Sequence, residues 1–244
     1  MSKVVTTTLL PDVAGGTVTL GGTGDSVVAT GNDLRTNVLQ DAGGNAVFTS
    51  DGSGVLSGVN SAFGGALKLI QSQTASNSAS VSFTSGIDST YDVYIFKFFD
   101  VNPVTDNARF TFNGSIDGGT NYNVTKTTTV IEAHHSEVGG NTGLAYEASR
   151  DLAQSTSYQI LTEATGNAAD ESCAGELYLY APSSTTYVKH FYGTFPNLHG
   201  SEYLWIQYVG GYFNTTDNID AIDFKMSTGN IDSGVIKLYG ISKS

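Results

Sequence analysis

Short runs of alternating apolar and polar residues, separated by glycine-containing turns, recur through most of this 244-residue chain. Alternation of this kind places the apolar side chains on one face of a β-strand, whereas a helix repeats them about every 3.6 residues. The only segment with any helical character, residues 145–154, has the length for a turn or two. The pattern therefore predicts an all-β fold, an antiparallel β-sandwich of jelly-roll type or close to it.

The runs that predict strands share large aliphatic and aromatic side chains at alternate positions. They are Ser78–Phe83, Asp92–Val101, Arg109–Asn113, Glu176–Tyr180, Tyr187–Tyr192, Tyr203–Val209, Ile222–Met226 and Val235–Ile241. Clusters of glycine, asparagine and aspartate between these runs are typical of turns.

The first 65 residues differ from the rest, because they contain paired glycines and, before residue 60, a single aromatic residue, Phe48. Residues 38–48 predict a strand, a turn and a second strand, and Val55-Leu56 begins another. Val18–Leu20 and Val27–Ala29 predict two more short strands. Strands this short bury too little apolar surface to offset the entropy of ordering them, so they must pack against something else.

These differences predict two parts. Residues 1–65 form a glycine-rich, short-strand N-terminal β-arm for docking or oligomerisation, and residues 66–244 form the β-sandwich domain. Deletion of residues 1–60 is then expected to leave a folded sandwich that no longer joins its assembly.

The charge balance argues against two classes of partner. The chain has 11 Lys and Arg against 23 Asp and Glu, a net charge of −12. Such a surface repels nucleic-acid phosphates and anionic membranes. The sequence contains no apolar run of 18 residues, so no membrane insertion is expected. Because residues 1–6 do not resemble a signal peptide, synthesis in the cytoplasm without export is expected.

Metal and nucleophile chemistry has few candidate residues. His134 and His135 are adjacent, so on a strand they point to opposite faces and do not share a tetrahedral ion, and His190 and His199 lack ligands at suitable spacing. Cys173 is expected to be a small, partly buried residue, with the acidic residues before it raising its thiol pKa. No metal and no cofactor are therefore predicted.

No hydrolase pattern stands out. Gly200-Ser201-Glu202 is the nearest fragment to a nucleophile elbow and lacks its flanking elements. A glycosidase needs two carboxylates facing one cleft, and the glutamates are scattered singly, so spacing selects no pair. These glutamates are Glu132, Glu137, Glu147, Glu163, Glu171, Glu176 and Glu202. The sequence therefore predicts a protein that is not an enzyme.

Two further groups suggest ligand binding without establishing it. Asp117 and the Asp217–Asp220 segment offer oxygen ligands for calcium, but neither matches the twelve-residue calcium loop, and solvated turns are the favoured interpretation. Trp205 lies among Tyr203, Tyr208 and Tyr212, a grouping that can stack on sugar rings. Both faces of this strand are largely apolar, which favours packing in a core or an interface.

Several segments together resemble virion structural proteins of tailed bacteriophages, particularly marine ones. The segments are Gly86–Tyr91, Asn121–Thr125, Pro182–Val188, Gly211–Thr216, Phe224–Ile231 and Ile236–Ile241, and the residues around 37–60 are similar to the turn-rich β-modules of phage fibres. The resemblance implies a non-enzymatic head-decoration or fibre-like component, located in the virion, that binds other capsid or tail proteins. By analogy it implies a homotrimer. The alternative is a receptor- or carbohydrate-binding module of a tail or fibre that recognises a host-surface glycan.

Overall fold

The computed structural model describes residues 38–40, 45–50, 53, 56–57 and 66–243. Contacts divide the chain into two compact units, Met1–Asn60 and Ser61–Ser244, which are described separately. The predicted boundary at residue 65 lies among residues 58–65, outside the described residues, and stays a prediction.

The N-terminal unit contains a small antiparallel sheet. Its strands are β1 (Val38–Gln40), β2 (Ala46–Ser50) and β3 (Leu56–Ser57), in the order β1-β2-β3. Leu39 pairs with Phe48. The two predicted strands and the following short strand are therefore confirmed, and the turn between the first two, residues 41–44, lies outside the described residues. The strands predicted at Val18–Leu20 and Val27–Ala29 lie outside the described residues.

The second unit is built from long strands. They are β4 (Leu67–Ser78), β5 (Val81–Phe83), β6 (Val93–Pro103), β7 (Phe110–Ser115), β8 (Lys126–Ser136), β9 (Thr142–Tyr146), β10 (Gln159–Ile160), β11 (Cys173–Tyr180), β12 (Lys189–His199), β13 (Tyr203–Phe213), β14 (Ala221–Met226) and β15 (Ile231–Ile241).

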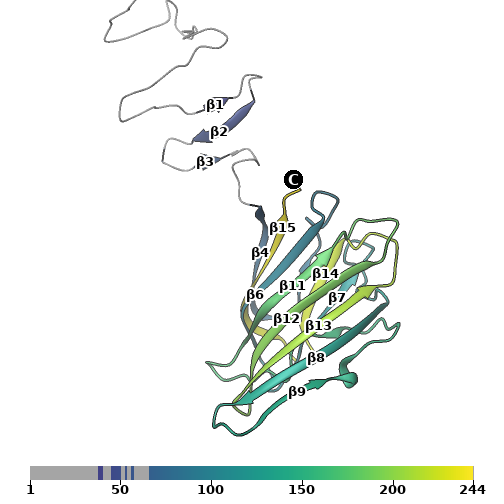
Figure 1. The fold of residues 1–244 in the computed structure, drawn as a ribbon. Coiled ribbons are helices and arrows are strands. Elements are labelled where there is room, and N and C mark those ends of the chain that lie inside the picture. The colour runs from purple at the N-terminus through teal and green to yellow at the C-terminus, as the bar shows by residue number, and fades with distance from the viewer. Residues whose placement is uncertain (1–37, 41–44, 51–52, 54–55, 58–65, 244) are drawn as a thin grey trace, which may run out of the picture. The chain divides into compact units, whose positions relative to one another are not determined.

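These strands form two antiparallel sheets that pack face to face (Figure 1). The larger has the order β4-β15-β6-β11-β12-β13-β8-β9, and the smaller has the order β10-β7-β14-β5. The predicted all-β antiparallel sandwich is confirmed. Its only helical turn among the described residues is the 3₁₀ segment η2 (Ala148–Arg150), within the segment that was expected to form a turn or two.

Phenylalanine rings from both sheets fill the space between them. Phe224 on β14 is fully buried, and its ring centroid lies 5.1 Å from that of Phe98 and 5.2 Å from that of Phe96, both on β6. Edge-to-face packing at this separation is favourable for aromatic rings. The apolar residues whose alternation predicted these strands therefore form the inner faces of the sandwich.

One predicted strand is divided in two. Residues 78–83 were expected to run as a single strand, but β4 ends at Ser78 and β5 begins at Val81. Asn77 has a φ of 49°, in the left-handed region that asparagine tolerates. The chain bends there and passes from the large sheet to the small one, which alternation of side chains cannot indicate.

Among the described residues, no helix has the length and hydropathy needed to cross a bilayer.

Candidate functional site

The two adjacent histidines lie on opposite faces of β8, as the strand geometry predicted. His134 packs against Trp205, with ring centroids 4.2 Å apart, and His199 lies on the same tryptophan at 6.2 Å. His135 instead has its Nδ1 2.8 Å from the Ser136 carbonyl oxygen. Burial lowers the pKa of His199. Among the described residues, no three His, Cys, Asp or Glu side chains gather in a way that would hold a metal ion.

Trp205 does not form an open platform for a sugar. It shares the inner face of β13 with Gln207 and Val209, which are buried, and its ring is covered by His134. The other face of β13 is different, because Leu204 is 47% exposed and Tyr208 is 46% exposed. Within a single chain, β13 is therefore covered on its inner face only, and not on both faces as the sequence suggested.

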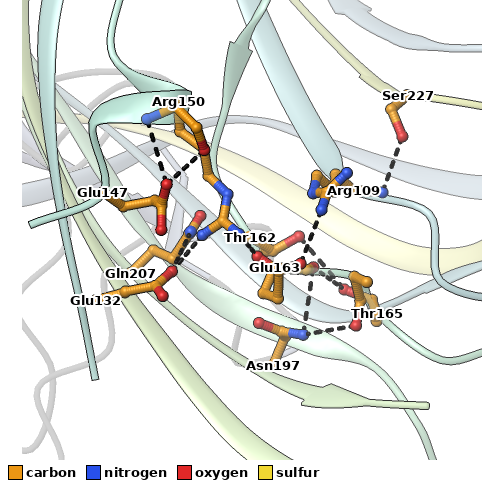
Figure 2. Close-up of polar contacts among 12 residues, drawn as sticks. Arg109, Glu132, Glu147, Arg150, Thr162, Glu163, Thr165, Asn197, Gln207 and Ser227 are labelled. Carbon is orange, nitrogen blue, oxygen red and sulfur yellow. Dashed lines mark hydrogen bonds and ion pairs between the residues drawn. The ribbon is translucent and has the colours of Figure 1, made fainter. Parts of the chain in front are cut away.

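Two of the scattered glutamates meet at one arginine on the inner side of the large sheet (Figure 2). Glu132 on β8 and Glu163 in the β10–β11 connection both pair with the guanidinium of Arg150, which belongs to η2. The three side chains are 7%, 8% and 11% exposed. Arg109 adds a second cation, with its Nη2 2.9 Å from Glu163 Oε1.

Buried amides complete this cluster. Gln207 donates from Nε2 to Glu132 Oε2 over 3.3 Å, and Asn197 donates from Nδ2 to the backbone oxygen of Glu163 over 3.4 Å (Figure 2). The cluster thus ties β8, β12 and β13 to the long connection that follows β9. A glycosidase keeps space for sugar and water between its carboxyl groups, but here the guanidinium of Arg150 fills that space. We therefore assign this cluster a structural role.

The aspartate segments form hydrogen-bonded turns. The carboxylate of Asp117 accepts hydrogen bonds from the Asn121 backbone and side-chain nitrogens and from Ser115. These bonds, Asn121 first, lower the pKa of Asp117 to about 2. Asp220 accepts from the backbone nitrogen of Gly118. Because backbone and side-chain donors already engage these oxygens, the structure supports the interpretation as turns.

Cys173 lies in the core rather than partly buried as expected. It begins β11 and is 1% exposed, and burial raises its thiol pKa to about 12. The direction of the shift was predicted, but its cause is desolvation and not the preceding acidic residues. A thiol held in this form is a weak nucleophile.

Two lysines are buried on either side of Phe213, in one row across β12, β13 and β8. Lys126 and Lys189 are both fully buried. The Lys126 ammonium donates to the carbonyl oxygens of Val124, over 3.1 Å, and Ser157, over 2.6 Å. Burial lowers the pKa of Lys126 to about 7 and also lowers that of Lys189.

Lys126 should make the fold more stable as the pH rises above 7. Between pH 7 and 10.5 the unfolded chain keeps the proton on Lys126 while the folded chain releases it, so the free energy of unfolding increases with pH. We expect a gain of about 1–3 kcal/mol between pH 7 and 9.5, measured by urea unfolding. Lys126→Met should remove most of this rise and leave the part due to Lys189. Lys237→Met, at a half-buried position on the opposite face of the large sheet, is the control. An unchanged rise in Lys126→Met would contradict the assignment.

The face of the eight-stranded sheet that points away from the core, called the outer face below, carries several exposed large apolar side chains. Neighbouring positions on adjacent strands share it, as Tyr208, Ile131 and Tyr146 do across β13, β8 and β9. Its exposed large apolar side chains include Phe99, Ile131, Leu144, Tyr146, Tyr192, Leu204 and Tyr208.

No family model, curated protein or solved structure matches this chain.

The sequence did not separate the outer face from the core, because the apolar residues of β13 were assigned to packing in a core or an interface. Leu177 and Leu179 on β11 are indeed buried, but Tyr178 and Tyr180 between them lie on the outer face. The sequence did carry a signal for the outer face, namely the type of residue that alternates with leucine along the strand. Alternation of leucine with tyrosine, rather than with charged residues, marks a strand whose second face also carries apolar surface.

Proposed function

We propose that the chain is a non-enzymatic structural protein of a tailed-bacteriophage virion, a head-decoration or fibre-like component. The supporting observation is the outer face, because contiguous exposed apolar surface marks protein interaction sites. Leu144 on β9 is 77% exposed and Tyr146 is 61% exposed, which is costly unless a partner covers them. In this proposal the N-terminal segment docks on other capsid or tail proteins, and the β9 edge of the outer face, with Leu144 and Tyr146, packs within a homotrimer.

Two further observations support this role. The net charge of −12 suits the outside of a particle better than a surface that lines packaged DNA. The buried glutamates Glu132 and Glu163 are both engaged by Arg150, which leaves no open pair of carboxyl groups there.

Purified particles provide the direct test of location. Mass spectrometry should find the chain in stoichiometric amount, and immunogold labelling should place it on the head, the tail or a fibre. Light scattering of the isolated protein should give the mass of a trimer. Absence from washed particles would contradict the proposal.

A charged residue on the outer face should block assembly without unfolding the chain. Leu144→Glu places a carboxylate on an edge strand at a position that is already exposed, so the melting temperature should change little. Burial of that charge at a protein contact is unfavourable, and we expect at least a tenfold loss of trimer and of incorporation into particles. Val138→Glu is the matched control, because Val138 is 92% exposed in the β8–β9 turn. Normal assembly of Leu144→Glu would show that the outer face is not the contact surface.

A further inference from the structure

A shallow cavity of about 370 Å³ lies on the outer face over strands β8, β12 and β13. At its centre Tyr192, Gly210 and Thr129 form one row across the three strands. Its walls and floor are formed by Thr127, Thr128, Thr129, Tyr180, His190, Phe191, Tyr192, Gly210, Gly211 and Tyr212. This volume lies within the range of small-molecule sites, near its lower end.

Gly210 creates the open floor of this cavity. A Cβ atom at neighbouring Gly211 would lie 2.6 Å from the Thr127 carbonyl oxygen, so packing requires that glycine. A Cβ atom at Gly210 would meet nothing within 4 Å, and the residue needs no left-handed backbone. A glycine inside a strand weakens the strand, and it often marks a place where a ligand approaches the backbone closely. Because packing does not require a glycine at position 210, the effect of Gly210 that the structure shows is the open space above it.

Stacked tyrosines build one wall. The rings of Tyr178 and Tyr192 lie 4.9 Å apart and are parallel within 1°, a separation equal to the spacing of neighbouring strands. One face of the Tyr192 ring is therefore covered by Tyr178 on β11, and its other face looks across the sheet toward Gly210 on β13. Tyr180 lies 6.0 Å from Tyr192 at 17° and extends the stack. Tyr192 itself is 48% exposed.

The polar groups of the cavity are neutral hydrogen-bonding groups. The lining is largely apolar, its polar side chains are those of threonine, tyrosine and His190, and it includes no carboxylate, lysine or arginine. The chain as a whole, with a net charge of −12, repels anions. An aromatic ring face beside a few neutral polar side chains suits a ligand with an apolar face and a hydroxylated rim, which is the chemistry of a neutral sugar ring.

We propose that this cavity binds a neutral saccharide, with one pyranose ring over Gly210 against the free face of Tyr192. Thr129 on β8 and the His190 ring line the cavity and can bond the sugar hydroxyls, whereas the Thr128 hydroxyl is buried and donates to Gln159. This proposal goes beyond the virion role and does not depend on it, because the site is complete within one chain.

The test uses the full chain and an array of neutral and anionic glycans, followed by titration calorimetry with the best neutral glycan from the array. Wild-type protein should bind neutral glycans. Gly210→Val fills the floor of the cavity, and it should weaken binding at least tenfold while the melting temperature stays equal or rises. Tyr192→Ala should weaken binding equally, and Tyr192→Phe should retain it. Tyr208→Ala removes an exposed tyrosine of the same face that does not line the cavity, so it should bind as wild type does.

Four outcomes would overturn the proposal. They are no glycan binding by the wild type, binding of anionic glycans only, wild-type affinity in Gly210→Val, and equal losses in Tyr192→Ala and Tyr208→Ala. The last result would indicate a broad apolar contact of the outer face, as in the proposed trimer, rather than a sugar site.

Discussion

Replacing Arg150 with methionine should destabilise the sandwich by about 3–5 kcal/mol, because it leaves Glu132 and Glu163 as buried charges without their shared cation. Arg109 reaches only Glu163 and is 39% exposed, so it compensates the loss only partly. Urea unfolding monitored by tryptophan fluorescence measures the change, since Trp205 is the single tryptophan of the chain.

Two variants separate the loss of the buried pairs from a general effect of losing a cation. Lys97→Met breaks the Lys97–Glu176 pair, whose side chains are 34% and 36% exposed, and it should cost less than about 1 kcal/mol. Glu132→Gln combined with Glu163→Gln and Arg150→Met removes all three charges and should recover part of the stability. A cost below about 1 kcal/mol for Arg150→Met would show that water reaches this cluster.

Phe224→Ala should be equally damaging, with an expected loss of about 3–5 kcal/mol. The Phe224 ring packs against Phe98 and Phe96 of the large sheet, and within the small sheet against Phe110 and Phe112 of β7. Truncation to alanine therefore removes the shared partner of these rings and opens a cavity between the sheets. Thermal and urea unfolding both measure the loss.

Phe99→Ala is the matched control for that prediction. Phe99 lies on β6, one residue from Phe98, but on the outer face, where it is 41% exposed. Its truncation should cost less than about 1 kcal/mol. Similar losses in the two variants would show that ring contacts between the sheets do not dominate the stability.

Alternation predicted the strands whose inner face is apolar and missed those whose inner face is polar. Strands β6 and β14 place phenylalanines inward and were recognised. Strand β8 places Lys126, Thr128 and Glu132 inward, and all three are buried. A pattern of hydrophobic residues therefore does not reveal β8 as a strand, although β8 pairs with β13 without a break.

The buried cluster and the tyrosine cavity were beyond reach of the sequence for a different reason. Glu132 and Glu163 are 31 residues apart, and only the path of the chain from β8 through η2 brings both to Arg150. Tyr178 and Tyr192 were placed on predicted strands, but their stacking depends on the register between β11 and β12. Turn geometry and packing set that register, and a shift of one residue would turn the Tyr192 side chain to the other face.

The order of strands in the large sheet has a consequence for synthesis of the chain on the ribosome. Strand β15 lies between β4 and β6, although it follows them by more than a hundred positions in the sequence. A nascent chain therefore keeps facing edges of β4 and β6 open until residues 231–241 have emerged. Translation at about 5–20 residues per second leaves these edges unpaired for about 7–28 s. Any product that stops before residue 231 keeps them open permanently, in a form suited to pairing with other chains.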